Sequence, residues 1–380
     1  MKLATLIGLC ALVAATALGC SNQTAPGGFL DGVGDDGGTS SGASGSGGGS
    51  SAPTPSGTAP SGSGGGAPTG STSGGSSGGG SSDAGGGVQM MTQADAAAAG
   101  DNPEVDYSQT KTVTMQTFPV PANSEVFYCQ TFANPWGKQV DIKSYDLSMD
   151  QGSHHFFAFY QANATNGSVA PCAAGGLTFG AFTFLSQTPK SVMTFPTTVG
   201  ATLPATTGFN MNVHYLNTGS TSLTAHVTLT MYIAKSGVVT NHAGVIFENN
   251  VTMMVPVTSM PVVSTSSNTI NQDAYVLLSA SHMHKFGKSF TSTYTPPGGQ
   301  AQTLYTTDQW DEPKPTTFQS PLHLPSGTTI TWSCTDVNTT MQTLTFGEYA
   351  QTNVMCISVS IFYPVADVNN PVLGTAVGGL

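Results

Sequence analysis

The sequence has 380 residues, of which 47 are glycine, and only 8% of all residues carry a charge. The formal net charge is −11, with nine lysines and arginines in total. This balance argues against nucleic-acid binding, which needs basic patches. Most of the glycine precedes Val88. Roughly 290 residues therefore remain for folding, which is enough for two ordinary domains.

The first 20 residues have the pattern of a secretion signal. Lys2 provides the positive charge, residues 3–18 are largely apolar, and Cys20 directly follows the small residue Gly19. This pattern resembles a bacterial lipoprotein signal, in which the cysteine is lipidated; plain secretion with cleavage nearby is the alternative. Both alternatives predict export, and lipidation of Cys20 would hold the protein at the outer membrane, the cell surface or in the periplasm. No later stretch reaches the roughly 18 apolar residues of a membrane span.

Residues 21–102 are rich in Gly, Ser, Ala, Thr and Pro and have almost nothing to bury, so we expect a disordered linker. From Pro103 the sequence changes to short runs rich in Val, Thr, Tyr and Phe, broken by Gly, Pro and Asn. Many short strands without a helical period predict an all-β protein. We expect two tandem antiparallel jelly-roll β-sandwich domains, at residues 103–234 and 235–366, and a tail at 367–380.

Export also bears on the state of the cysteines. One of the six lies within the signal, and Cys20 is the lipidated position. Four remain in the part that folds, and an even number in an oxidising compartment predicts two disulfides. The simplest pairing is one bridge per domain, Cys129–Cys172 and Cys334–Cys356, although four cysteines allow three connectivities.

A His-x-His pair, His282 and His284, stands at the end of an apolar run that begins at Tyr275 and predicts a β-strand. Residues two apart on a strand point to the same face. Two imidazoles can therefore hold one metal ion there, and imidazole suits zinc, copper, iron and nickel. Alone this pair is a weak signal. Histidines and a methionine in three other predicted strands strengthen it.

A second pair, His154 and His155, precedes a run of aromatic residues. Neighbours on a regular strand face opposite ways, so both can bind one ion only at an irregular strand start or a bulge. Gly152 permits such a start. The alternative is one buried and one exposed histidine.

His214 and Met355 complete the set of candidate ligands. His214 shares the polar face of its strand with Asn210 and Asn212, so the alternative to a ligand is a solvated surface residue. Met355 lies on the apolar face of its strand, and periodicity alone makes it a core residue; a thioether, however, favours Cu(I) over zinc. Cys356 points the other way, and a disulfide there would fix the strand that presents the thioether.

Together these segments resemble the copper type II, ascorbate-dependent monooxygenases, the family of peptidylglycine α-hydroxylating and dopamine β-monooxygenases. Four motifs in the family's order carry the resemblance across residues 103–364: the His-His pair before aromatics, Val213-His214-Tyr215, the His-x-His pair, and Met355-Cys356. The resemblance implies two jelly-roll domains facing each other across a water-filled cleft. The two disulfide pairs also match bridges of the family.

The resemblance implies two copper ions, one in each domain. An electron-transfer copper in the first domain would be held by His154, His155 and His214. A copper at which O2 and the substrate react, in the second domain, would be held by His282, His284 and Met355. The implied reaction is hydroxylation of an sp³ carbon, with ascorbate or another one-electron reductant as the electron source.

The chain departs from the peptide-amidating members where those enzymes hold the peptide's carboxylate. Ala280, Val359 and Ile357 stand at the places of an arginine, a tyrosine and an asparagine, respectively. None of the three side chains can bind a carboxylate. This argues against glycine-extended peptides and favours a small, fairly apolar substrate.

Three functions are then open. The first is an exported, lipid-anchored, monomeric copper monooxygenase that acts on a small molecule. The second is a copper-binding or copper-buffering surface lipoprotein without turnover, and the third is a purely structural β-sandwich lipoprotein. In the third case, substitutions at His154 and His284 would change neither metal content nor activity. The complete ligand set favours the enzyme, since drift away from activity is expected to break at least one ligand.

Overall fold

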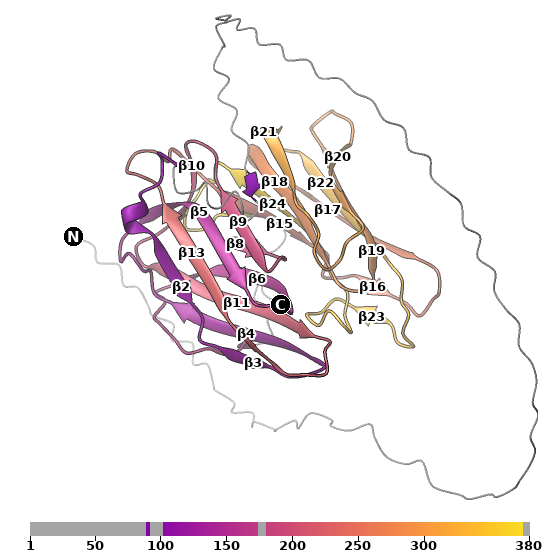
Figure 1. Cartoon of the computed structure of the whole chain (residues 1–380). Coiled ribbons are helices and arrows are strands. Elements are labelled where there is room, and N and C mark those ends of the chain that lie inside the picture. Colours follow the sequence, from indigo (N-terminus) through magenta and orange to yellow (C-terminus); the bar gives the residue numbers. More distant parts are fainter. Residues whose placement is uncertain (1–88, 92–101, 174–179, 375–380) are drawn as a thin grey trace, which may run out of the picture. The chain divides into compact units, whose positions relative to one another are not determined.

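The computed structural model describes residues 89–91, 102–173 and 180–374 (Figure 1). The predicted signal peptide with Cys20, the linker up to residue 88 and the chain from residue 375 lie outside the described residues. Within the described ranges the only helical element is the 3-10 turn Tyr107–Gln109, and the regular structure is otherwise β. This confirms the all-β prediction. No helix in this part of the chain is long and apolar enough to cross a membrane.

Strands from the first half of the folded chain, joined by the short strand Asn241–His242 from beyond the expected boundary at residue 234, build two large sheets. In the five-stranded sheet the order is β7 (Ala170–Pro171), β4 (Ser124–Phe132), β11 (Thr207–Asn217), β6 (Ser153–Ala162) and β8 (Phe182–Ser186). In the seven-stranded sheet the path is β1 (Gln89–Met91), β9 (Lys190–Thr194), β5 (Val140–Met149), β10 (Val199–Leu203) and β14 (Asn241–His242), with β13 (Val227–Ile233) pairing both β5 and β2 (Lys111–Thr114). A short ribbon joins β3 (Phe118–Val120) to β12 (Leu223–Ala225).

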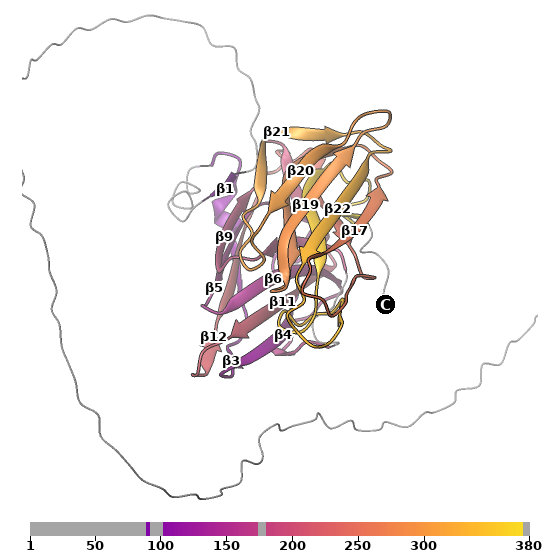
Figure 2. The same ribbon diagram turned by 90° about the vertical axis from the view of Figure 1, so that its right-hand side faces the viewer.

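The second half builds two further sheets. Figure 2 faces the four-stranded sheet, and Figure 1 labels four strands of the five-stranded sheet. The five-stranded sheet has the order β21 (Thr316–Leu324), β18 (Ala274–Met283), β24 (Cys356–Tyr363), β15 (Gly244–Asn249) and β25 (Val372–Leu373). The four-stranded sheet has the order β17 (Val262–Thr269), β22 (Thr329–Asp336), β19 (Gly287–Thr295) and β20 (Gln302–Thr307). A short ribbon pairs β16 (Met254–Val255) with β23 (Leu344–Thr345).

Two of these strands come from segments expected to lie outside the domains. β1 belongs to the predicted linker and pairs antiparallel with β9, and β25 belongs to the predicted tail and pairs in parallel with β15. Backbone pairing with an existing sheet satisfies their N–H and C=O groups, whatever their composition. The strand pairings establish the all-β class, while the jelly-roll order within each half stays a prediction.

Strands β18 and β24 are buried on both faces. On β18, Val276 and Met283 pack in the core of the second half, whereas Leu278 and Ala280 pack in a cluster that also holds first-half residues. A strand buried on both faces is expected to be apolar throughout, which explains the near-continuous apolar run of β18. The edge strand β17 instead alternates between half-buried and exposed residues.

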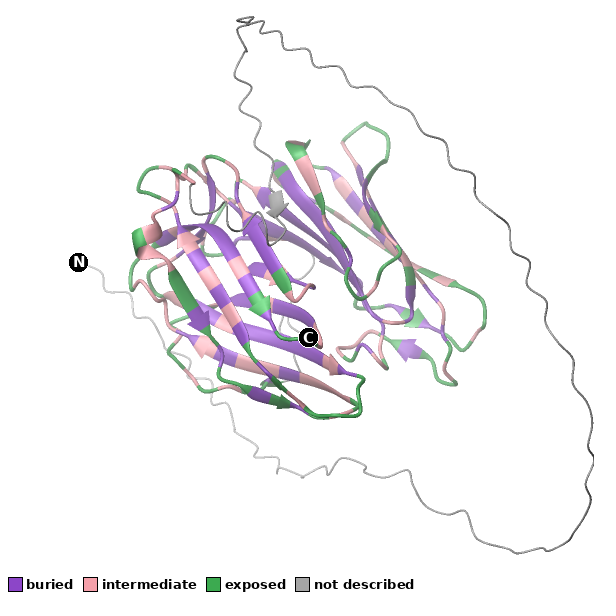
Figure 3. Cartoon of the chain, viewed as in Figure 1, coloured by how far each residue is buried: buried purple, intermediate pink, exposed green. Residues whose placement is uncertain are grey.

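The shared cluster joins the two halves through apolar side chains. In Figure 3, many of the strands in both halves are coloured as buried. Phe247 on β15 lies edge-on to Phe182 on β8, with ring centroids 5.4 Å apart. Val359 and Ile361 on β24 belong to the same cluster. Burial of this surface therefore holds the five-stranded sheet of the second half against the first half.

Both predicted disulfides are confirmed. Cys129 on β4 bonds Cys172, with their Cα atoms 4.9 Å apart. Cys334 on β22 bonds Cys356 at the start of β24, with a Cα–Cα distance of 5.8 Å. The second bridge links the two large sheets of the second half and lies next to Met355.

The shared apolar cluster should contribute strongly to stability. We expect Phe247→Ala to lower the free energy of unfolding by about 3–5 kcal/mol, because it leaves a cavity next to Phe182, against which the Phe247 ring packs. Urea denaturation followed by tryptophan fluorescence measures the change. Val263→Ala is the matched control, since Val263 is 63% exposed and its truncation should change stability by less than about 0.5 kcal/mol. Equal effects of the two substitutions would contradict the proposed role of the cluster.

Candidate metal centre

The end of β18 presents the His-x-His pair. His282 lies opposite Ile357 on β24. Continued by one more pair of residues, this register places Met355 opposite His284. His282, His284 and Met355 therefore share one face of the sheet. All three are buried, and Met355 belongs to the apolar cluster that joins the two halves.

The start of β6 presents the His-His pair through a β-bulge. In the pairing of β6 with β11, His214 lies opposite His155 and Tyr215 lies opposite Ser153, so His154 is the additional residue. Gly152 precedes the bulge with a φ of +92°, a conformation that favours glycine. This is the irregular strand start that two neighbouring histidines need in order to serve one site.

The five histidines form a single buried cluster. Their candidate ligand atoms fall into two groups, each with all atoms within 4.8 Å of one another. The first group is His154, His155 and His214, and the second is His154, His282 and His284. All five rings are at most 8% exposed, including His214, so the alternatives of an exposed histidine in the His-His pair and a solvated His214 are wrong.

The two groups are adjacent, which differs from the expected separation across a water-filled cleft. The ring of His282 lies 5.2 Å from that of His154 and 5.1 Å from that of His155, measured between centroids. The apolar faces that flank these histidines are buried against each other in the shared cluster. The free energy gained by burying this apolar surface holds the two histidine groups next to each other.

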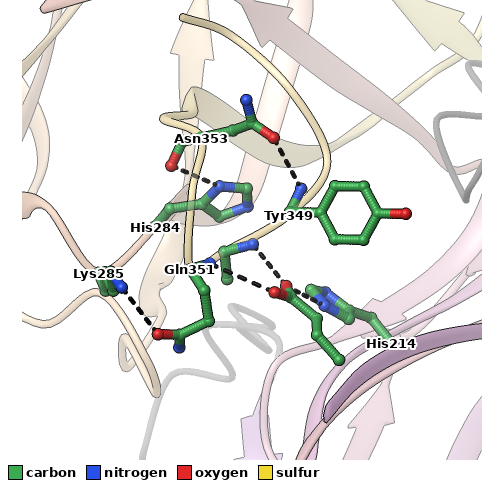
Figure 4. Close-up of polar contacts among 8 residues, drawn as sticks. His214, His284, Lys285, Tyr349, Gln351 and Asn353 are labelled. Carbon is green, nitrogen blue, oxygen red and sulfur yellow. Dashed lines mark hydrogen bonds and ion pairs between the residues drawn. The ribbon is translucent and has the colours of Figure 1, made fainter. Parts of the chain in front are cut away.

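Oxygen acceptors determine which ring nitrogen carries the proton in three of the histidines. Nε2 of His214 lies 2.7 Å from the Glu125 carboxylate, and Nδ1 of His284 lies 3.3 Å from the backbone oxygen of Asn353 (Figure 4). Nδ1 of His282 lies 2.6 Å from Oε1 of Gln187. Each of these oxygens accepts, so the ring nitrogen donates, and in a neutral ring the other nitrogen keeps its lone pair.

One nitrogen of each of the five rings is buried without a hydrogen-bond partner in the protein. These nitrogens are Nε2 of His154, Nδ1 of His155, Nδ1 of His214, Nε2 of His282 and Nε2 of His284. A buried polar atom without a partner costs free energy, commonly about 1–3 kcal/mol. A metal ion is a partner that would satisfy several of these lone pairs at once. The donor set therefore fits a metal such as copper.

Burial also keeps these rings in the form that binds metal. Desolvation is the largest cause in every case, and it lowers the pKa of all five histidines. The pKa of His282 falls to about 3, with the charge of His214 as a second cause. For His214, the hydrogen bond and charge of Glu125 offset part of the lowering of its pKa. The rings are neutral at pH 7, as metal ligation requires.

Three residues that sequence patterns did not single out contact the cluster. Glu125 and Gln187 accept from His214 and His282, and the ring of Trp310 lies 5.7 Å from that of His154. Trp310 is in the loop between β20 and β21, and it is half-buried. A single glutamate, glutamine or tryptophan in a loop or at a strand start forms no periodic sequence pattern. Only the tertiary contacts therefore reveal the role of these three residues.

No family model matches this sequence, and no curated protein shows significant similarity to it. Among solved structures, the major capsid protein P2 from bacteriophage PM2 aligns with 69% of this chain and 100% of its own, at 8% identity and a TM-score of 0.29. The exported protein XepA of PBSX aligns with 66% of this chain and 86% of its own, at 7% identity and a TM-score of 0.18. Similarities this low support neither a fold assignment nor a function.

The lowered histidine pKa values predict how stability depends on pH in the metal-free protein. Unfolded histidines titrate near 6.5, whereas folded His282 titrates at about 3, so the unfolded state binds more protons between these values. Stability contributed by His282 is thus present above pH 6.5 and lost as pH falls toward 3. We expect the free energy of unfolding to decrease below pH 6.5, by up to ~1.4 kcal/mol per pH unit for each such group.

Urea unfolding at pH 7, 6, 5 and 4 checks this dependence. His282→Gln should reduce the slope, because glutamine does not titrate. An unchanged slope in this variant would mean that His282 protonates as readily in the folded protein as in the unfolded chain.

Proposed function

We propose that this chain is an exported, copper-dependent monooxygenase that hydroxylates an sp³ C–H bond of a small, fairly apolar molecule. O2 and an ascorbate-like one-electron reductant would be its co-substrates. One observation carries the proposal: five buried histidines each keep a ring nitrogen without a protein partner, and Met355 is buried on the sheet face of the His-x-His pair. In this proposal the two halves are jelly-roll domains of the copper type II kind, anchored through Cys20.

The donor types favour copper over the other metals that imidazole accepts. A thioether beside two imidazoles suits Cu(I), and three imidazoles suit copper in either oxidation state. Bound copper would supply one-electron redox chemistry, which zinc lacks. His154 completes a three-histidine site with His155 and His214, and Met355 completes the site of His282 and His284.

The protein's own groups have defined tasks in this proposal. Glu125, Gln187 and the backbone of Asn353 orient three of the rings and hold their protons on the nitrogens that face away from the metal. The burial of the cluster limits the access of water, which lowers the loss of reactive species to side reactions. Trp310 covers the ring of His154 from the second half.

An apolar pocket next to the cluster supports the substrate class. Its lining includes Phe184, Met193, Leu278, Ala280, Pro313 and Val359. Ala280 lies two residues before His282 on the same strand face, about 7 Å along the strand. None of the described residues that line the pocket carries a charge. Such a pocket suits a small apolar molecule better than a carboxylate or an amine.

Copper binding without turnover is the second candidate function. The observation that favours it is the deep burial of all five rings and Met355, which restricts the approach of reactants. A copper-buffering lipoprotein would bind the same ions through the same residues. Oxygen uptake that depends on a substrate separates the two candidates.

Copper stoichiometry tests the ligand assignment. We expect the exported, disulfide-bonded protein to bind two copper ions per chain. Met355→Ala should retain the three-histidine copper and weaken the second site by about tenfold or more, as Cu(I) loses a soft ligand. Met260→Ala is the matched control, because Met260 is 68% exposed. The proposal would be contradicted if Met355→Ala bound as much copper as the wild type, or if the wild type bound no copper.

Oxygen uptake under ascorbate tests the pocket. Ala280→Phe should reduce substrate-dependent uptake about tenfold or more at constant copper content, because the larger ring fills the apolar pocket. A panel of small apolar compounds is compared in an oxygen electrode, with product analysis by mass spectrometry. Ala301→Phe, at an exposed alanine, is the control. Equal uptake with every compound and without any compound would favour the copper-buffering alternative.

A further inference from the structure

Gln187 connects the first half of the chain to a metal-ligand candidate of the second half. It follows β8 directly and is 8% exposed. Its Nε2 donates to the backbone oxygen of Ser281 at 2.6 Å, and its Oε1 lies 2.6 Å from Nδ1 of His282. Both partners lie on β18. The amide thus bonds two consecutive residues of the opposite half.

These two bonds leave one orientation for the amide and one tautomer for the ring. The backbone oxygen of Ser281 can only accept, so the NH2 group of Gln187 must point to it. The amide oxygen then faces His282, and Nδ1 of that ring must donate. The lone pair is left on Nε2 of His282, which is buried without a hydrogen-bond partner in the protein. His282 groups with His154 and His284 as a candidate metal site.

Glu125 provides an independent parallel on the other histidine group. Its carboxylate accepts from Nε2 of His214 in its own half. The same carboxylate accepts the backbone N–H groups of Ala350 and Gln351, which belong to the loop whose Asn353 holds His284 (Figure 4). Each histidine group therefore has one buried side chain that accepts from an imidazole and also bonds the backbone of the opposite half.

We infer that Gln187 is a positioning residue for the His282 metal site and that it acts only while the two halves are in contact. The inference rests on the proposed function for the identity of the metal, and it adds a condition to that function. Separation of the halves removes the amide from His282, which then loses both its fixed tautomer and its fixed ring orientation. The affinity of this site for metal should therefore be higher when the two halves are in contact than when they are separated.

Gln187 also borders the pocket proposed for the substrate. Gln187 lines the apolar pocket together with Ala280 and Val359. A molecule in the pocket contacts the residue that orients His282.

Two substitutions separate positioning from mere packing. Gln187→Met keeps the approximate size and removes the acceptor, so copper affinity at the His282 site should fall 10–100-fold. Gln187→Glu keeps an acceptor for Nδ1 but, when ionised, has no donor for the backbone oxygen of Ser281. Its copper affinity should therefore fall less than that of Gln187→Met. Gln272→Met is the matched control, because Gln272 is a half-buried glutamine whose Nε2 donates to the backbone oxygen of Pro364 and not to a histidine of the cluster.

A second readout needs no metal. Long-range ¹H–¹⁵N NMR of the metal-free protein should show His282 with its proton on Nδ1 in the wild type and in Gln187→Glu. In Gln187→Met the ring should become a mixture of tautomers. Thermal melting curves identify any variant that fails to fold.

The outcomes distinguish the inference from the function on which it rests. Wild-type affinity and an unchanged tautomer in a folded Gln187→Met variant would overturn the inference and leave the copper proposal standing. Failure of the wild type to bind copper would overturn the proposed function, and the tautomer comparison would then decide whether Gln187 positions His282. Equal losses of copper affinity in the Met and Glu variants, with the same His282 tautomer in both, would show packing rather than positioning.

Discussion

Burial of apolar surface between the two halves is the constraint on which the rest of the structure depends. The sheet of β15, β18 and β24 is apolar on both faces, and its second face packs in the cluster that also holds first-half residues. Closing that face against the first half stabilises the fold, and it also encloses five imidazoles that would otherwise be hydrated. The free energy gained from apolar contacts offsets the desolvation of these rings. A stable fold thus contains a set of unsatisfied donors for a metal ion.

Much of the fold was predictable because its signals are local. Short runs of β-branched and aromatic residues gave the all-β class, and an even number of cysteines in an exported chain gave the two bridges. The bulge at His154 was one of two alternatives that the sequence left open, and Gly152 permits it. Each of these inferences needs only the spacing of residues along one segment.

The arrangement of the candidate site was not predictable in the same way. The approach of His282 to His154 depends on contacts between residues more than a hundred positions apart, and no periodic pattern encodes which faces meet. Gln187 and Glu125 are single polar residues whose roles come entirely from tertiary geometry. The expectation of a water-filled cleft failed because the apolar residues beside the histidines, Leu278 and Ala280 among them, are as well suited to contact as to lining a cavity.

The β-bulge at the start of β6 has one additional residue, and this residue decides to which face of the sheet His154 points. Side chains alternate along a strand, so one additional residue exchanges inner and outer positions for everything that precedes it. Loss of a single residue between Gly152 and His155 would restore regular pairing with β11 and send one imidazole to the opposite side of the sheet. Such a change removes no strand and no core residue. A chain that drifts in length here would therefore keep its architecture and lose a ligand, which makes this short segment more sensitive to deletions than to most substitutions.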